Sequence, residues 1–190
     1  MIIKGLSMSL RQLKIDNKWT LFLDRDGVIN EKIENDYVRN YSQFHLLPDV
    51  LKALNGISGI FGKIIIVTNQ RGVAKGLMSI SDVDSIHKNL IEKVDNAGGR
   101  IDRIYICPHN YLDNCNCRKP KTGMAEMAKT DFPGINFKKS IMVGDSETDI
   151  IFGRKAGMRT VMISKNEINS SVKDGVVFFK SLYDFYLSLM

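Results

Sequence analysis

The stretch "WTLFLDRDGVIN" (Trp19–Asn30) decides the fold prediction, because a short apolar run in it ends in two aspartates. Residues 20–24 are almost continuously apolar, which is typical of a strand that is covered on both faces. Asp24 and Asp26 follow at its end, and Gly27 permits a sharp turn. A surface turn can bring two carboxylates together by chance. A site that holds a cation and attacks an electrophile requires them together.

Four further segments have the same apolar character, and they alternate with segments whose apolar residues recur at helical spacing. This alternation predicts an α/β fold, a doubly wound parallel sheet with right-handed crossovers and helices on both faces. The expected strands are residues 20–24, 63–68, 103–107, 140–144 and 159–163. The expected helices are residues 48–57, 81–99 with Ser81 as the cap and Gly98–Gly99 as the stop, 123–130, 148–156 and 182–189.

Length and composition limit the class of protein. The chain of 190 residues, 44% hydrophobic and 25% charged, predicts a single domain over residues 19–190 after an N-terminal extension, residues 1–18. No apolar run approaches the roughly 20 residues of a membrane helix, and the N-terminus lacks signal-peptide features. We therefore expect a cytoplasmic protein, most simply a monomer, without a membrane partner. The net charge of +6 permits nucleic-acid binding, but the lysines and arginines are scattered, which favours an ordinary solvated basic surface. A small anionic substrate would also suit such a surface.

Polar residues follow three of the predicted strands. Asp24, Thr68 and Asp145 stand at strand ends, and the carboxyl ends of parallel strands form the ligand-binding edge of such a sheet. Asp24, Asp26 and Asp145 could together hold a hard divalent cation such as Mg²⁺. An EF-hand is excluded, because its glycine stands at the sixth loop position and Gly27 comes earlier. A chance structural cluster is the alternative to a magnesium site.

This set of residues suits phosphoryl transfer. A cation beside a carboxylate keeps it ionised and removes its repulsion of an incoming phosphate. Asp24 could then attack phosphorus and form an aspartyl-phosphate, while Asp26 protonates the leaving oxygen and later deprotonates the attacking water. Lys119 could offset the charge of a phosphate, or it could be an ordinary surface lysine. Asp149 could either orient Lys119 or cap the next helix. The expected phosphate-binding residues are Thr68, Asn69, Arg118 and Lys119.

The stretch "CPHNYLDNCNC" (residues 107–117) holds all three cysteines of the chain and one of its three histidines. Its spacing, C-x-H-x5-C-x-C, offers four ligands on one loop, which suits tetrahedral Zn²⁺. A fully ligated ion leaves no open position, so we expect a structural zinc and not a catalytic one. Disulfide pairing is the alternative, and a cytoplasmic location disfavours it. The expected zinc ligands are Cys107, His109, Cys115 and Cys117.

Three other polar residues near these motifs have no expected chemical role. Arg25 should point away from the site as a structural residue, because alternate side chains along a strand face opposite sides. His45 and His87 are expected to be surface or packing residues, since neither has an evident partner in the sequence.

The motifs "DRDGVIN", "TNQRGVAKG", "CPH…CNCRKPKTGM" and "VGDSETDI", in this order, resemble the haloacid dehalogenase (HAD) superfamily of phosphohydrolases. They resemble in particular its zinc-loop clade, which contains heptose bisphosphate and histidinol-phosphate phosphatases. The resemblance covers about residues 20–165 and implies that Asp24 is the nucleophile, Asp26 the general acid/base, and Thr68 and Lys119 phosphate binders. It also implies Mg²⁺ on Asp24, Asp145 and the backbone carbonyl of Asp26. The zinc loop then stands in for a separate cap domain, so the enzyme is capless.

The substrate implied by the resemblance is a sugar bisphosphate. "TNQRGVAKG" and "CRKPKTGM" resemble the enzymes that remove the 7-phosphate of D-glycero-D-manno-heptose 1,7-bisphosphate, with Arg118 on the second phosphate. The short separation of His109 from Cys115 resembles the histidinol-phosphate type instead, and Ser146 replaces a basic residue of some heptose enzymes. Two other classes remain as alternatives. A nucleic-acid end phosphatase agrees with the pI of about 9.2 but not with the absence of a basic stripe, and a non-catalytic zinc-loop module would not need the intact carboxylates.

Overall fold

The computed structural model describes residues 13–164 and 175–190, so residues 1–12 of the expected N-terminal extension lie outside the described residues. Its centre is one six-stranded parallel sheet with the order β3-β2-β1-β4-β5-β6. The strands are β1 (Thr20–Leu23), β2 (Lys63–Asn69), β3 (Arg103–Cys107), β4 (Ser140–Gly144), β5 (Arg159–Ile163) and β6 (Val176–Phe179).

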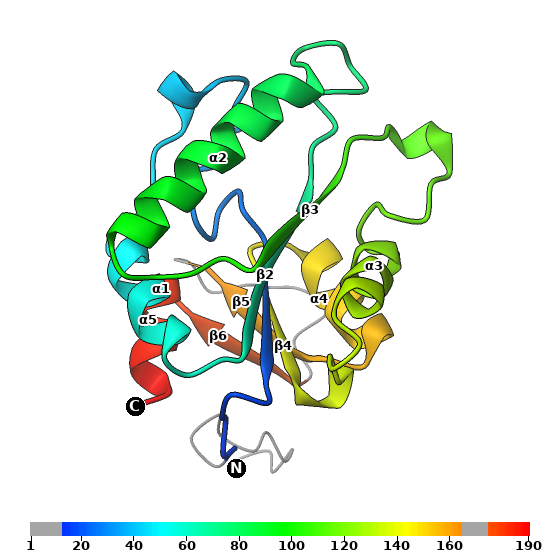
Figure 1. Ribbon diagram of the computed structural model, residues 1–190. Coiled ribbons are helices and arrows are strands. Elements are labelled where there is room, and N and C mark those ends of the chain that lie inside the picture. The colour runs from blue at the N-terminus through cyan, green and yellow to red at the C-terminus, as the bar shows by residue number, and fades with distance from the viewer. Residues whose placement is uncertain (1–12, 165–174) are drawn as a thin grey trace, which may run out of the picture.

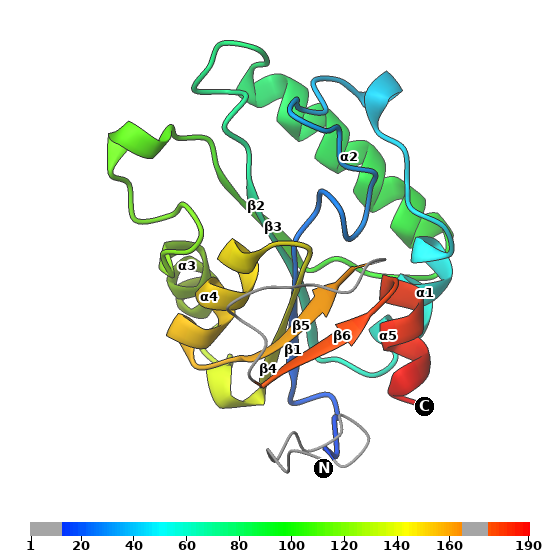
Figure 2. The same cartoon turned by 180° about the vertical axis from the view of Figure 1, so that it is seen from behind.

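Helices cover both faces of the sheet (Figures 1 and 2). One layer contains α1 (Val50–Ser58), α2 (Ile80–Asn96) and α5 (Leu182–Ser188), and the other contains α3 (Gly123–Asp131) and α4 (Glu147–Ala156). Within the described residues, short 3-10 turns lie in the connections: η2 (Tyr41–Gln43), η3 (Tyr111–Asp113) and η4 (Phe137–Lys139). The predicted doubly wound α/β fold is confirmed. In the described part of the chain, no helix is long and apolar enough to cross a membrane.

Strand β1 shows why the strands are apolar along their whole length. Leu21 and Leu23 pack into the layer of α1, α2 and α5, whereas Phe22 packs into the layer of α3 and α4, and all three are fully buried. Successive side chains of a strand point to opposite faces, so a sheet with two covered faces requires apolar residues at every position.

Some predicted boundaries need correction. The prediction that Ser81 caps α2 was wrong: the Ser79 hydroxyl accepts a hydrogen bond from the Asp82 amide (3.1 Å), and the Asp82 carboxylate accepts one from the Ser79 amide (2.8 Å). The buried apolar residues of this helix begin at Val83. Their spacing therefore does not show whether the helix starts after Ser79 or after Ser81. Helix α1 begins at Val50, two residues after Pro48. Strand β6 was not predicted, because it is a short, partly exposed edge strand.

The order of the strands reverses between β1 and β4. From β1 the chain continues outward to β2 and β3, then returns to β4 on the other side and continues to β5 and β6. The Asp24 amide donates to the carbonyl of Val143 (2.9 Å), so the residues that follow β1 and β4 lie at one point of the sheet edge. Such a reversal point at the carboxyl ends is where α/β sheets bind ligands.

Candidate active site

A cavity of about 250 Å³ lies at this point of the sheet edge. Its wall combines acidic, amide, hydroxyl and cationic side chains that come from four different connections. The structure thus brings together every residue that we expected to bind the catalytic metal or the phosphate: Asp24, Asp26, Thr68, Asn69, Arg118, Lys119 and Asp145.

Lys119 is buried at the base of the cavity, with 3% of its surface exposed, so it is not an ordinary surface lysine. Its Nζ lies 2.8 Å from Asp24 Oδ1 and 2.6 Å from Asp149 Oδ1, and it donates to the carbonyl of Val67 (2.7 Å). Burial disfavours the charged ammonium, but Asp149 and Asp24 raise the pKa of Lys119 above its usual value. Lys119 is therefore held as a cation that touches the expected nucleophile.

Asp149 orients Lys119 and also caps a helix, so the two alternatives for this residue are both true. While Oδ1 faces Lys119, Oδ2 accepts hydrogen bonds from the amide (3.1 Å) and the hydroxyl (2.6 Å) of Ser146, the residue before α4. Asp149 is fully buried. Its position follows from the first turn of α4, which begins directly after β4.

The acidic cluster fits a divalent cation. Carboxylate oxygens of Asp24, Asp145 and Asp149 lie within 4.8 Å of one another. Oδ2 of Asp145 meets Lys32 Nζ (2.7 Å), but its buried Oδ1 has no hydrogen-bond partner among the described residues. Burial raises the pKa of Asp24 to about 7, with Lys119 opposing the shift and Asp149 adding to it. A bound cation would use the free oxygen and favour the charged form of Asp24.

Gly27 makes room for this cluster. Its φ is +89°, and a Cβ at this position would stand 2.4 Å from Oδ2 of Asp145. Any other residue would therefore push the Asp145 carboxylate away from the turn after β1. The turn and the end of β4 can approach closely only because this position has no side chain.

The Asp26 carboxylate is held by several donors. Oδ1 accepts from Asn30 Nδ2 (2.9 Å), Oδ2 accepts from Gln70 Nε2 (2.9 Å), and Arg25 Nη2 lies 2.9 Å from both oxygens. Burial alone would raise the pKa of Asp26, but Arg25 and the hydrogen bonds from Asn30 and Gln70 hold it below its usual value. The expectation that Arg25 is purely structural and points away therefore needs correction, because its guanidinium turns back onto Asp26.

Asn69, the last residue of β2, and Gln70, which follows it, hold different parts of the site. Gln70, which sequence reasoning missed, donates from Nε2 to both Thr68 Oγ1 (2.8 Å) and Asp26 Oδ2. Asn69 was expected to offer its amide to phosphoryl oxygens, but its Oδ1 accepts from the Lys119 amide (3.1 Å) and its Nδ2 faces the Lys119 carbonyl (3.3 Å). Asn69 therefore fixes the backbone that carries Lys119. The available signal for Gln70 was its place directly after a predicted strand.

Two arginines that line the cavity, Arg71 and Arg118, contact the ring of Tyr111 at its rim. The guanidinium carbon lies 4.2 Å from the ring centroid for Arg71 and 4.1 Å for Arg118. Arg71 also donates from Nε to Asn110 Oδ1 (2.9 Å), and Arg118 reaches the His109 carbonyl (3.4 Å). Stacking of this kind restricts a guanidinium while its edge stays free for an anion. Arg71 was not expected from the sequence, since only the fold places it on the same ring as Arg118.

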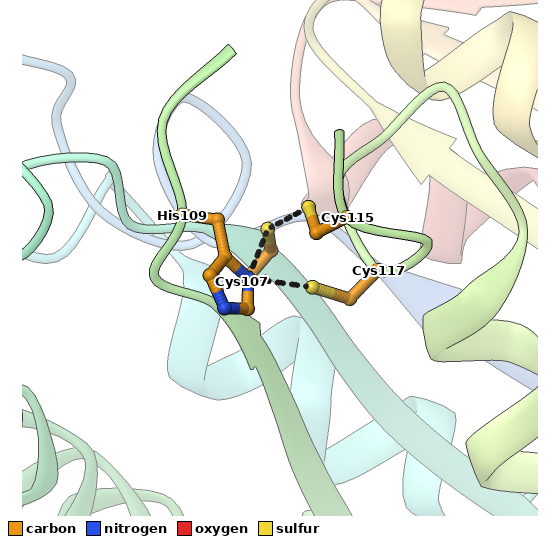
Figure 3. Close-up of side chains that lie close together, drawn as sticks. All are labelled: Cys107, His109, Cys115 and Cys117. Atoms are coloured by element: carbon orange, nitrogen blue, oxygen red, sulfur yellow. Dashed lines mark hydrogen bonds between the residues drawn. The ribbon is translucent and has the colours of Figure 1, made fainter. Parts of the chain in front are cut away.

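The cysteine and histidine side chains of residues 107–117 converge (Figure 3). Cys107 Sγ lies 3.6 Å from Cys115 Sγ and 3.8 Å from His109 Nδ1, which is 3.1 Å from Cys117 Sγ. Ligand atoms around a tetrahedral Zn²⁺ stand about 3.5–3.8 Å apart at ordinary Zn–S and Zn–N lengths. The three cysteines are free, so no disulfide competes with this cluster. The four side chains fit a closed zinc site.

Similarity to known proteins agrees with the geometry of this site. A family model for HAD-hydrolase-like proteins matches residues 116–174. The D-glycero-alpha-D-manno-heptose-1,7-bisphosphate 7-phosphatase of Mycobacterium bovis is 37% identical over 175 residues, which cover 91% of this chain and 92% of that protein. The chain belongs to the heptose bisphosphate phosphatase family of HAD-like hydrolases. The predicted superfamily and enzyme class, a phosphoric monoester hydrolase, are confirmed.

Two further similarities help to define this HAD-like phosphatase. The crystal structure of D,D-heptose 1,7-bisphosphate phosphatase from B. bronchiseptica, complexed with magnesium and phosphate, superposes with a TM-score of 0.82. The two sequences are 26% identical, and the superposition covers 90% of this chain and 97% of the B. bronchiseptica chain. The histidine biosynthesis bifunctional protein HisB of Blochmanniella floridana is 34% identical over 154 residues, 80% of this chain but only 43% of that protein.

The zinc site leads to a first prediction. The purified phosphatase should contain one zinc per chain, and its removal should disorder residues 108–118 and displace Lys119, so activity is lost even with saturating Mg²⁺. Elemental analysis and hydrogen exchange over this loop measure both effects. Cys115→Ser should reproduce the loss, whereas Asn116→Ser, between two ligands, should keep the metal. A zinc-free and fully active enzyme would contradict the assignment.

The buried ion pairs lead to a second prediction. Lys119→Met leaves the Asp24 and Asp149 carboxylates buried without their cation, which should lower the free energy of unfolding by about 3 kcal/mol. Activity should fall at least about 10³-fold, because the cation next to the nucleophile is lost. Urea unfolding with a chelator present and steady-state kinetics with Mg²⁺ test the two effects. Lys138→Met, at an exposed lysine, is the control and should change neither. Unchanged stability in Lys119→Met would contradict the analysis.

Proposed function

We propose that this phosphatase removes the 7-phosphate of D-glycero-D-manno-heptose 1,7-bisphosphate in a Mg²⁺-dependent reaction, through an aspartyl-phosphate on Asp24. The observation that carries the proposal is the contact of Asp24 with the buried Lys119 cation at the base of a cavity whose rim holds two arginines. The base suits the phosphate that is cleaved, and the rim suits a second phosphate of the same substrate. The relative from Mycobacterium bovis carries this substrate in its name.

The first half of the reaction transfers the phosphoryl group to the protein. An oxygen of the Asp24 carboxylate attacks phosphorus, the ester P–O bond breaks, and the leaving sugar oxygen takes a proton from Asp26. The charge that develops on the phosphoryl oxygens meets the Lys119 ammonium and the Thr68 hydroxyl. Asp26 is ionised in the free enzyme, and the negative charge of an arriving phosphate raises the pKa of a neighbouring carboxyl group, which favours its protonation.

The second half of the reaction restores the enzyme. Asp26, now a carboxylate, accepts a proton from water, and the hydroxide attacks phosphorus so that the bond to Asp24 breaks and phosphate leaves. Loss of that proton to solvent returns Asp26 to its ionised form. Mg²⁺ held by the side chains of Asp24 and Asp145 and the backbone carbonyl of Asp26 would offset the negative charge that gathers there. The donor atoms suit this ion, because they are oxygens and one of them, Asp145 Oδ1, has no partner among the described residues.

The second phosphate would bind at the rim. Arg71 and Arg118 both contact the ring of Tyr111 and both line the cavity, so two positive charges stand near one another where a second phosphate could bind. Lys32 also lines the cavity, but its ammonium is paired with Asp145 of the acidic cluster (2.7 Å). A sugar bisphosphate matches an acidic metal site at the base and cations at the rim better than a substrate with one phosphate does.

Histidinol phosphate is the second candidate. The short zinc loop and the similarity to HisB favour it. Its imidazole and amine groups offer no anion to the two arginines, whereas the bisphosphate does. The expected cytoplasmic location, the monomeric state and the absence of nucleic-acid partners stay predictions.

A substrate comparison tests the proposed function. The heptose bisphosphate, as both α and β anomers, should be hydrolysed with a kcat/KM at least about 10²-fold above that for histidinol phosphate, because the second phosphate adds charge-assisted bonds. Asp24→Asn should abolish the turnover of every ester, since the amide is a poor nucleophile. The opposite ranking would favour histidinol phosphate. Residual activity of Asp24→Asn within tenfold of wild type would exclude covalent catalysis by Asp24.

The rim arginines give a separate prediction. Arg71→Ala and Arg118→Ala should each lower kcat/KM for the bisphosphate by about 10–100-fold, because each removes charged hydrogen bonds to the second phosphate. For heptose 7-phosphate, which has no second phosphate, the loss should stay below about threefold. The control is Arg103→Ala, which removes an equal charge at the start of β3, the end of the strand away from the cavity. It should leave kcat/KM unchanged for both substrates. Equal losses on both substrates would show that the arginines only support the loop.

A further inference from the structure

His87 lies outside the cavity but touches the network that holds Asp26. It belongs to α2, is 7% exposed, and its Nε2 lies 3.1 Å from Nη1 of Arg25. This partner was not evident from the sequence, because the two residues are 62 positions apart. His87 was expected to be a surface or packing residue without an evident partner; it is buried, but it does have a partner, Arg25.

The chemistry of the two groups sets the direction of this hydrogen bond. A guanidinium has only donors, so Nε2 of His87 must accept, and the ring must be neutral with its proton on Nδ1. Burial and the charge of Arg25 lower the pKa of His87 to about 3, which agrees with a neutral ring at physiological pH. His87 thus offers Arg25 a fixed acceptor without adding charge.

Arg25 is fully buried, and its contacts occupy the guanidinium on several sides. Nη2 and Nε face the Asp26 carboxylate, Nη1 faces His87, and the Phe44 ring centroid lies 5.8 Å from Cζ. Among the described residues, His87 is the hydrogen-bond partner of Nη1. Because the guanidinium is planar and rigid, an acceptor on one edge also fixes the orientation of the other edge.

The position of the Asp26 carboxylate depends on this orientation. Asn30 and Gln70 each contribute one hydrogen bond to it, whereas Arg25 contacts both of its oxygens. Without an acceptor for Nη1, a buried charged donor is left unpaired, and the guanidinium has to turn to find another partner. The carboxylate that it holds would turn with it.

We propose that His87 is a positioning residue for the reaction, which acts through Arg25 to hold Asp26 where it can exchange protons with the leaving group and with water. The inference rests on the proposed role of Asp26 as general acid and base. It predicts a defect of proton transfer and not of phosphate binding, because His87 does not line the cavity.

Leaving-group dependence distinguishes such a defect from a general loss of structure. A sugar alkoxide needs a proton as it leaves, whereas 2,4-dinitrophenolate leaves without one. In His87→Leu, kcat/KM for the heptose bisphosphate should fall by about 10–100-fold, and kcat/KM for 2,4-dinitrophenyl phosphate by less than about threefold. His87→Gln retains an acceptor, through its amide oxygen, and should recover most of the activity. His87→Ala replaces His87→Leu if the latter does not fold.

The first turnover gives a second measurement. Asp26 also serves as the base that activates water, so a misplaced Asp26 should slow the hydrolysis of the aspartyl-phosphate whatever the leaving group. With 2,4-dinitrophenyl phosphate, the His87→Leu enzyme should therefore show a burst of about one dinitrophenolate per active site, followed by a slower steady state. The matched control is Val83→Ala on the same buried side of α2, which lowers packing without contact to Arg25 and should show neither effect.

Each outcome decides between specific alternatives. Equal loss on both substrates in His87→Leu, or no recovery in His87→Gln, would overturn the inference and leave His87 a packing residue. Asp26→Asn is the reference for the proposed function: if it too lacks leaving-group dependence, the role of Asp26 fails first. If Asp26→Asn shows the dependence and His87→Leu does not, only the inference about His87 fails.

Discussion

The rest of the site depends on one buried cation, Lys119, that is shared by two buried carboxylates. A charged group without solvent is tolerated only when it is paired, and here the partners Asp24 and Asp149 come from β1 and α4. Lys119 itself follows the zinc loop, and Asn69 at the end of β2 fixes its backbone. One electrostatic requirement therefore ties together four connections of the sheet and sets the base of the cavity.

The zinc loop connects this base to the rim. Its two arms are held together by the four converging side chains, and Lys121 adds hydrogen bonds to the Asn114 side chain (2.8 Å) and the Cys115 carbonyl (2.8 Å). A loop without a core of its own needs such cross-links to keep a defined shape. Because Tyr111 and Arg118 belong to the same loop, the closed metal site also sets where the rim cations stand. A structural zinc in this loop would therefore also influence the position of the proposed second-phosphate site.

The proton-transfer side of the site is built differently. Asp26 lies on a turn, and its carboxylate is held by Arg25, Asn30 and Gln70, with His87 behind Arg25. Gln70 links this network to Thr68, so the proposed phosphate-binding group and the proposed acid and base share one amide. The ammonium of Lys119 holds the expected nucleophile, whereas a guanidinium and two neutral amides hold the expected acid and base. The two kinds of support allow each function to be perturbed separately.

The sequence by itself determined the first five strands of the sheet and the superfamily, and it singled out the carboxylates and the cysteine and histidine side chains that converge in the structure, because apolar strands and short motifs are local patterns. It could not place a buried arginine against a histidine 62 positions away, nor bring Arg71 and Arg118 to the ring of Tyr111. It left the role of Asp149 open, assigned Asn69 a contact that the backbone of Lys119 takes instead, and missed the edge strand β6. These features depend on which elements pack together, and only the tertiary structure brings distant side chains within hydrogen-bonding distance.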